Sequence, residues 1–186
     1  MKEWSGRNNK HPREIWKSSS TKYWLLCGKC GVEYEQCSKK METSKCFLCT
    51  KVSECKVYMF LRNEYEKVEV QAKFDWCKSF SFDIALLDLK IIIEVDGAHH
   101  FTPLGHWKTG WEVCNNDLEK EELALSNQFS IIRVLQKHVY SDSSDWRSFL
   151  KSAIEEAQKK QPVVLHSDER EYTSGIYARL RCDSFF

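Results

Sequence analysis

The sequence lacks any hydrophobic segment long enough to cross a membrane. Its longest apolar run, Ile91–Val95, is interrupted by Glu94, whereas a spanning helix needs about 20 apolar residues. The amino-terminal stretch MKEWSGRNNK also lacks the apolar core of a secretory signal. We therefore expect that the protein has no membrane partner and is intracellular. The expected compartment is the cytoplasm, or the nucleus if the protein is eukaryotic or viral.

The chain also lacks a large net charge and internal repeats, but its charge is unevenly distributed. Residues 1–51 contain 11 Lys and Arg against 5 Asp and Glu, and residues 52–186 contain 17 against 22. A basic segment favours contact with an anionic partner, and a solvated basic surface is the plain alternative. Seven Trp, seven Tyr and ten Phe exclude global disorder. The 186 residues suffice for one ordinary domain and a small appendage.

Nine cysteines are present, and in a reducing compartment they predict metal ligands and free thiols rather than disulfides. Two C-x2-C pairs stand fifteen residues apart, and their members are Cys27, Cys30, Cys46 and Cys49. Four thiolates presented by two tight turns form a closed tetrahedral site, which is typical of structural zinc. Cys37, between the pairs, and Cys55, just after them, are the alternative ligands.

Residues 1–50 are therefore expected to form a basic arm and a zinc ribbon, and the first 20 residues are expected to be loose. The basic and aromatic residues that such a ribbon would present are Lys22, Lys29, Lys39, Lys40, Lys45, Tyr23, Trp24 and Tyr34. Lysines suit a phosphate backbone and aromatic rings stack on bases, so these residues predict nucleic-acid binding. A ribbon that binds protein is the alternative.

From residue 51 onward, the hydrophobic pattern predicts the order helix, three strands, helix, strand, helix. The expected ranges are 51–65, 68–76, 79–87, 90–95, 112–128, 129–135 and 145–160. The second of these helices would bury Val113, Leu118, Leu123 and Leu125, and residues 99–110 would form a loop before it. This order predicts an α/β fold, with a mixed sheet covered by helices on both faces.

Three acidic residues interrupt the strand patterns. Asp83 lies in the second expected strand, and Glu94 and Asp96 lie at the end of the third. A hairpin of these strands would place Asp83 opposite Glu94, and the spacing of Glu94 and Asp96 puts both on one face. Carboxylates gathered in this way suit a hard divalent cation such as Mg²⁺ or Mn²⁺. A solvated strand end is the alternative.

Two further groups of residues follow these strands. His99 and His100 come after Gly97, and His100 is the better placed to act as a general base or an additional ligand. Asp117 and Lys120 are expected one turn apart at the start of the next helix, where Lys120 could stabilise phosphate charge. The alternatives are a loop histidine, an acid at a helix start and a surface cation.

The patterns FDIALLDLKIIIEVDGAHHF and NNDLEKEELALSNQFSIIRV together resemble the PD-(D/E)XK nuclease superfamily. Within it, the resemblance is to the very-short-patch-repair-like endonuclease branch, which includes phage and giant-virus enzymes with an N-terminal zinc ribbon. The matching residues are Asp83, the run from Ile92 to His100, Asp117, Lys120, Ile132 and Arg133. The resemblance covers about residues 22–140. Asp96 stands where the superfamily has a lysine, and the branch uses carboxylates and a histidine instead.

The resemblance implies a restriction-endonuclease-like αβββαβ core in residues 51–186, following the ribbon of residues 1–50. It implies a Mg²⁺-dependent endodeoxyribonuclease, a hydrolase of DNA phosphodiester bonds. Asp83 and Glu94 would hold the metal with help from Asp96 and Glu54, and His100 would deprotonate or position the attacking water. Lys120, next to Asp117, would hold the DNA backbone.

Two alternatives to a nuclease remain open, together with the number of subunits. One alternative is a catalytically inactive nucleic-acid-binding or protein-adaptor module on the same fold. The other is a transcription-type zinc ribbon joined to an unrelated α/β domain. Cleavage of both strands by a single site would imply a homodimer.

Overall fold

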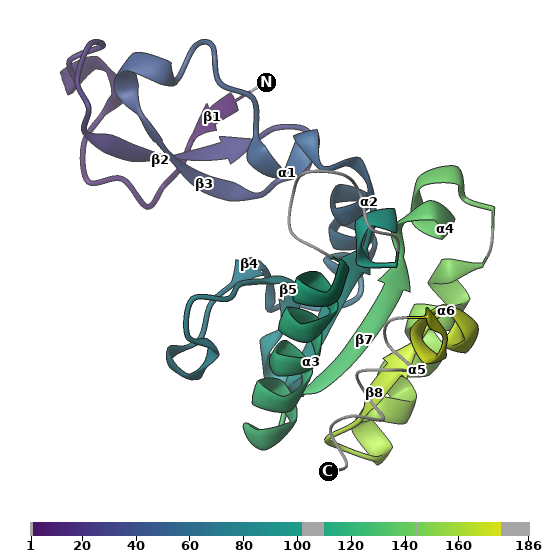
Figure 1. The fold of residues 1–186 in the computed structure, drawn as a ribbon. Helices are drawn as coiled ribbons and strands as arrows, with labels where there is room; N and C mark the ends of the chain where they lie inside the picture. Colours follow the sequence, from purple (N-terminus) through teal and green to yellow (C-terminus); the bar gives the residue numbers. More distant parts are fainter. Residues whose placement is uncertain (1, 102–109, 144, 176–186) are drawn as a thin grey trace. The chain divides into compact units, whose positions relative to one another are not determined.

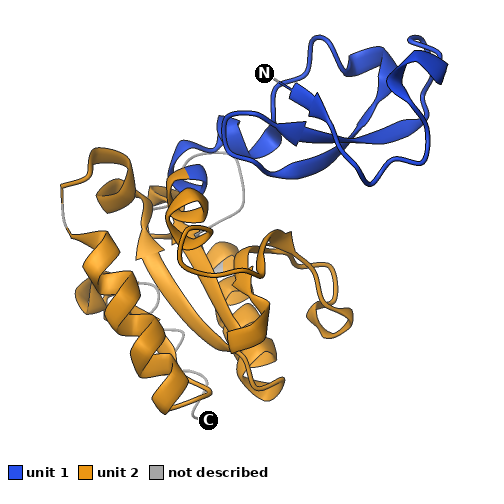
Figure 2. Cartoon of the chain, turned by 180° about the vertical axis from the view of Figure 1, so that it is seen from behind, with its two compact units in different colours: residues 1–55 blue, residues 56–186 orange. Residues whose placement is uncertain are grey.

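The structure is a computed structural model that describes residues 2–101, 110–143 and 145–175. Figure 2 shows that the chain divides into two compact units, residues 1–55 (unit 1) and residues 56–186 (unit 2). The sequence instead predicts a boundary between residues 50 and 51. Each unit is described by itself below.

Unit 1 contains a three-stranded antiparallel sheet with the strand order β1-β2-β3. The strands are β1 (Lys2–Trp4), β2 (Lys22–Cys27) and β3 (Glu33–Cys37). The single-turn helices are η1 (Pro12–Glu14), η2 (Ser38–Lys40) and α1 (Phe47–Thr50). The prediction of a loose amino-terminal arm is wrong, because β1 pairs with β2 and aligns Lys2 with Cys27. Such a strand is held by backbone hydrogen bonds, which leave no hydrophobic pattern in a polar sequence.

Unit 2 is built on a five-stranded mixed sheet with the order β4-β5-β6-β7-β8 (Figure 1). The strands are β4 (Val68–Ala72), β5 (Phe82–Leu86), β6 (Ile91–Asp96), β7 (Ser130–Leu135) and β8 (Val164–His166). The first three strands are antiparallel, and β7 runs parallel to both β6 and β8. The predicted mixed sheet is therefore confirmed. Strand β8 lies beyond the last element that the hydrophobic pattern predicts.

The helices of the chain lie before, between and after these strands. They are α2 (Val52–Leu61), α3 (Gly110–Ser126), α4 (Gln136–Ser141), α5 (Trp146–Lys159) and α6 (Glu169–Thr173), with the 3-10 turns η3 (Asp75–Cys77), η4 (Leu87–Leu89) and η5 (Ala98–His100). Helices α3 and α5 both pack on β7 and cover opposite faces of the sheet (Figures 1 and 2). Among the described residues, no helix combines the length and apolar character that crossing a membrane requires.

The first strand of unit 2 is shorter than its alternating pattern predicts. Strand β4 ends at Ala72, and Gln71 has a positive φ of 53° that turns the chain toward η3. The Cys77 thiol then joins the two sides of the turn, because it accepts from Phe74 N at 3.2 Å and donates to Phe80 O at 3.0 Å. Alternation alone does not reveal this turn, since its aromatic residues continue the pattern of the strand.

The predicted buried face of α3 is wrong. Val113, Leu118, Leu123 and Leu125 are only half-buried. Among the described side chains of the helix, the buried ones are Cys114, Asp117, Glu121 and Ala124. The buried side chains lie three or four positions apart and form one stripe. Half of this stripe is acidic because it meets an arginine from the sheet. The predicted loop at 99–110 falls largely on residues 102–109, which lie outside the described residues.

Candidate functional site

The four predicted zinc ligands of unit 1 come together. Their sulfur atoms all lie within 4.8 Å of one another, with Cys27 Sγ 3.6 Å from Cys49 Sγ and Cys30 Sγ 3.7 Å from Cys46 Sγ. A tetrahedral zinc with Zn–S distances of about 2.3 Å requires S–S separations of about 3.8 Å. The cluster is thus compatible with a structural zinc site. Within residues 2–101, 110–143 and 145–175, no other set of three or more Cys, His, Asp or Glu residues converges in this way.

Burial makes three of these four thiols harder to ionise. Burial raises the pKa of Cys30 and Cys46 to about 11 and that of Cys49 to about 12. Burial acts in the same sense on Cys27, but the backbone donors of Cys30 and Lys29 outweigh it and bring the pKa of Cys27 to about 7. A cation bound among them would offset the cost of forming buried thiolates, which would couple metal binding to folding.

The predicted nucleic-acid contacts of the ribbon are only partly presented to solvent. All five lysines are exposed, but Tyr34 is buried, so its predicted role in stacking is wrong. Trp24 is half-buried beneath the guanidinium of Arg7, which lies 3.8 Å from the ring centroid. Lys22 Nζ lies 4.0 Å from Glu35, the residue that pairs with Trp24 across the sheet. This face of the sheet is therefore acidic as well as basic.

The remaining lysines of this set are Lys29, Lys39, Lys40 and Lys45. Each lies outside the β2–β3 face, in the turn after β2 or in the segment that follows β3. They are consequently the stronger candidates for phosphate contacts.

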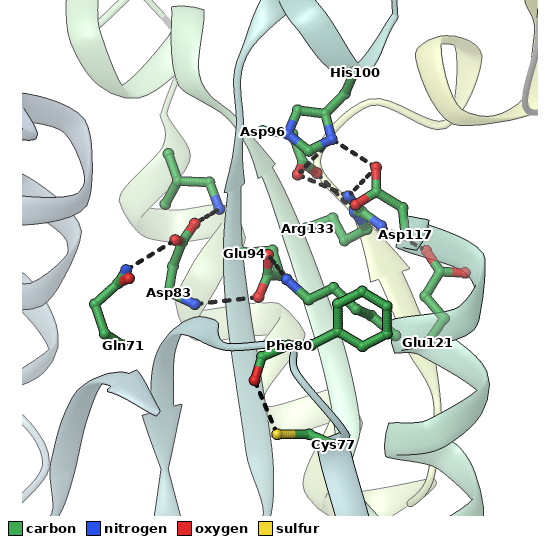
Figure 3. Close-up of polar contacts among 12 residues, drawn as sticks. Gln71, Cys77, Phe80, Asp83, Glu94, Asp96, His100, Asp117, Glu121 and Arg133 are labelled. Atoms are coloured by element: carbon green, nitrogen blue, oxygen red, sulfur yellow. Dashed lines mark hydrogen bonds and ion pairs between the residues drawn. The ribbon is translucent and has the colours of Figure 1, made fainter. Parts of the chain in front are cut away.

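In unit 2, the hairpin of β5 and β6 places Asp83 beside Glu94, as predicted. The backbone N–H of Asp83 donates to Glu94 Oε1 at 3.2 Å, and the backbone N–H of Val95 donates to Asp83 Oδ2 at 3.0 Å. The second oxygen of Asp83 accepts from Gln71 Nε2 at 3.3 Å, which links β4 to the same pair of strands (Figure 3).

The remaining oxygen of Glu94 meets a lysine from α3. Lys120 Nζ donates to Glu94 Oε2 at 2.7 Å, and both side chains are largely buried. Burial raises the pKa of Glu94 to about 7, with a smaller contribution from Asp83 in the same sense, even though Lys120 opposes the shift. A carboxyl group in this environment would be stabilised in its charged form by an additional cation.

Asp96, at the end of β6, faces a different partner. Arg133 of β7 donates to both carboxylate oxygens, from Nε at 2.7 Å and from Nη2 at 2.8 Å, and the hydroxyl of Tyr172 donates at 2.5 Å. Burial would raise the pKa of Asp96, but the charge and hydrogen bonds of Arg133 outweigh it and hold the pKa below its usual range. Asp96 is thus engaged in a buried ion pair, and the binding of Mg²⁺ by Asp83 and Glu94 stays a prediction.

Arg133 is the centre of a buried network that includes two acids of α3. It lies 3.0 Å from Glu121 Oε1 and 3.1 Å from Asp117 Oδ2 (Figure 3). Asp117 is 4% exposed and lies in the middle of α3. The expectation that Asp117 and Lys120 lie at the helix start is therefore wrong, and so is the alternative that Asp117 is only a first-turn acid of the helix.

His100 joins this network at its edge. Its Nδ1 lies 2.6 Å from Asp117 Oδ2 and 3.7 Å from Asp96 Oδ1. Burial would lower the pKa of His100, but the bond to Asp117 and the charge of Asp96 outweigh it and raise the pKa above its usual range. Burial and the neighbouring His100 lower the pKa of His99, which distinguishes the two histidines.

The predicted contribution of Glu54 is not tested by this geometry. Glu54 lies in the part of α2 that belongs to unit 1, and its carboxylate lies 2.9 Å from Lys51 Nζ. The role of Glu54 in catalysis stays a prediction.

Four residues of unit 2 join the site without having been assigned a role by the sequence, namely Gln71, Glu121, Arg133 and Tyr172. The sequence does carry a signal for Arg133, because it is the one charged residue of the apolar strand β7. Tyr172 carries no such signal, since it lies 76 residues from Asp96 in the chain.

The chain matches no protein-family model, no curated protein and no solved structure. The class of protein is therefore argued from the structure alone. Unit 1 contains a four-cysteine cluster, and unit 2 is an α/β unit with buried ionisable groups at the ends of its strands.

Proposed function

We propose that this protein is a metal-dependent DNA endonuclease with a restriction-endonuclease-like core and a DNA-binding zinc ribbon. The observation that carries the proposal is the arrangement of Asp83, Glu94 and Lys120. Two carboxylates lie on neighbouring antiparallel strands, and Lys120 Nζ is 2.7 Å from Glu94 Oε2. The order of α2, β4, β5, β6, α3 and β7 also supports an αβββαβ core.

The oxygen ligands of Asp83 and Glu94 suit Mg²⁺ or Mn²⁺. A divalent cation held there would lower the pKa of a bound water and offset charge on the scissile phosphate. Lys120 would turn from Glu94 toward the phosphate, where it would stabilise the negative charge that develops in the transition state.

His100 and Asp117 would complete the site. Because the pKa of His100 is raised by Asp117 and Asp96, the imidazole stays protonated to a higher pH than usual. This favours His100 as a cation that positions the water or the phosphate, rather than as the group that removes the proton. Arg133 would act indirectly, by fixing Asp96 and Asp117.

The zinc ribbon would supply affinity for DNA through the lysines that lie away from the β2–β3 face. Four thiolates leave a zinc ion no open position for substrate, so the metal of unit 1 would have a structural role only. Lys29, Lys39, Lys40 and Lys45 are exposed and suit contacts with phosphates.

One observation favours a second function, that of a catalytically inactive nucleic-acid-binding or adaptor module. Every carboxylate oxygen of Asp83 and Glu94 already has a donor from the protein. A purely structural ion-pair network would also satisfy every carboxylate oxygen with a donor from the protein.

Incubation of supercoiled plasmid with the full chain separates the two functions. For a nuclease, we expect cleavage with Mg²⁺ or Mn²⁺ and none with a chelator. Asp83→Asn should abolish it, whereas the matched control Asp88→Asn, an exposed acid paired with Lys67 at 2.8 Å, should cleave normally. DNA binding without cleavage in either metal would favour the inactive module. The product, open circle or linear, reports whether one strand or both are cut.

A further inference from the structure

Unit 1 presents one large aromatic side chain almost entirely to solvent. Trp16 is 83% exposed, more than any other large hydrophobic residue in the described part of the chain, and Tyr140 of unit 2 follows at 66%. Exposure of an indole ring is unfavourable in water, because the ring forgoes the packing that burial or stacking would provide.

The backbone that carries Trp16 is held in place. The hydroxyl of the buried Ser38 lies 2.7 Å from Trp16 O and 2.9 Å from Ser19 O, within hydrogen-bonding distance of both carbonyls. Ser19 N also donates to Trp16 O at 3.2 Å, and Lys39 N donates to Ser19 O at 3.2 Å. The indole is thus carried by a loop that is hydrogen-bonded to η2.

The same hydrogen bonds tie the backbone of two cationic residues to the segment that carries Trp16. Lys39 and Lys40 belong to η2, and both are exposed. Lys17 follows Trp16 directly, with its side chain 91% exposed and its Nζ 3.7 Å from Glu42. We call Trp16, Lys17, Lys39 and Lys40 the Trp16 surface. It combines a flat apolar ring with three positive charges and one nearby acid.

We propose that the Trp16 surface binds unpaired nucleotides, with Trp16 stacked on a base and Lys39 and Lys40 on the adjoining phosphates. This inference rests on the proposed function of the ribbon in DNA binding and specifies the form of DNA that it contacts. The faces of bases inside a duplex are already stacked, so a protruding ring gains most from single-stranded or frayed DNA.

Charge explains why this part of the ribbon is favoured over the β2–β3 face. There, Arg7 lies 3.8 Å from Glu33, and Lys22 lies 4.0 Å from Glu35. Those acids would repel phosphate. On the Trp16 surface, Lys39 Nζ donates to the neutral hydroxyl of Ser20 at 3.0 Å, which leaves its positive charge uncompensated by that partner.

The test measures the affinity of the full chain for a labelled oligothymidylate of about 16 nucleotides over a range of salt concentrations. Trp16→Ala should weaken binding by about tenfold, because one base no longer has a ring to stack on, and should leave the salt dependence unchanged. Lys39→Gln with Lys40→Gln should instead lower the slope of log affinity against log salt by about 1.4 in magnitude. Tyr140→Ala, which removes the exposed aromatic residue of unit 2, is the matched control and should bind normally.

Three results would overturn the inference. They are wild-type affinity in Trp16→Ala, an equal drop in affinity in Tyr140→Ala, and an equal effect of Trp16→Ala on binding to an intact duplex with closed ends. If Trp16→Ala abolished binding to vesicles of anionic phospholipid but kept oligothymidylate binding, Trp16 would belong to a lipid-binding surface. A chain that never cleaves plasmid but shows the Trp16 effect would refute the nuclease proposal and support this one.

Discussion

Glu94 illustrates how burial sets the chemistry of a single side chain. Burial is the largest of the effects that raise its pKa from 4.5 to about 7. A raised carboxyl pKa means that the folded protein binds a proton that the unfolded chain releases. Its contribution to stability is therefore complete below pH 4.5 and is lost as the pH rises through about 7.

This shift leads to a prediction at the residue scale. Without divalent metal, the free energy of unfolding of the wild type should fall by about 3 kcal/mol over this pH range because of Glu94. In Glu94→Gln this component should be absent. Urea denaturation at a series of pH values measures the difference. The matched control is Glu64→Gln, an exposed acid 3.3 Å from Lys151, and it should behave as the wild type does. Equal pH dependence in Glu94→Gln and the wild type would contradict the argument.

Arg133 illustrates the cost of an uncompensated buried charge. Its replacement by Met would leave Asp96, Asp117 and Glu121 without their shared cation. We expect Arg133→Met to lower the free energy of unfolding by about 3–5 kcal/mol, because the remaining carboxylates would be buried without a compensating charge.

The control for Arg133 is an exposed arginine. Arg147 lies 3.1 Å from Asp142 with its side chain 49% exposed, and Arg147→Met should cost less than about 1 kcal/mol. Chemical denaturation of both variants provides the comparison. A decrease of less than about 1 kcal/mol in Arg133→Met would show that the network contributes little to folding.

At the scale of elements, the hairpin of β5 and β6 could be predicted because its strands are apolar and its charges are few. The assumption that these two strands form a hairpin gave the correct facing of Asp83 and Glu94. Strands β1 and β8 have three residues each, too few for a periodic signal, and they depend on backbone partners far away in the chain. Such partners are set by the fold and not by local sequence.

The buried face of α3 shows a second limit of sequence patterns. A face rich in Leu and Val is normally the buried one, but here the sheet presents Arg133 to the helix. Acidic residues are then favoured on the buried face, and Asp117 and Glu121 occupy it. Tyr172 could not be predicted for the same reason, because its role exists only in relation to Asp96 and Arg133.

We expect the four-cysteine cluster of unit 1 to hold a zinc ion on which the fold of this unit depends. Cys27→Ser should release the metal and destabilise residues 22–50, because much of the folding free energy of so small a module comes from its metal. Unit 2 should stay folded. Native mass spectrometry measures zinc content, and amide hydrogen exchange measures the stability of each unit. Cys37→Ser removes a thiol outside the cluster and should retain zinc. A wild-type protein purified without chelator and free of zinc would refute the assignment.

At the scale of the whole molecule, residues 1–51 are more basic than the rest of the chain, and this difference predicts how binding depends on salt. Changing Lys39, Lys40 and Lys45 together to Gln should weaken DNA binding and flatten its salt dependence by about 0.9 for each phosphate that is no longer neutralised. Three exposed lysines of unit 2, Lys67, Lys90 and Lys160, provide a control of equal charge. An unchanged slope in the ribbon variant would instead favour a protein-binding ribbon.

The proposal as a whole depends on Glu94 acting with a metal, and one measurement tests this most directly. It compares the rate of Mg²⁺-dependent plasmid cleavage by the wild type and by Glu94→Gln, at enzyme concentrations that saturate the DNA. We predict that the variant binds DNA at least as well, because a negative charge is removed, and cleaves at least about 100-fold more slowly. Cleavage at the wild-type rate by Glu94→Gln would contradict the proposed active site.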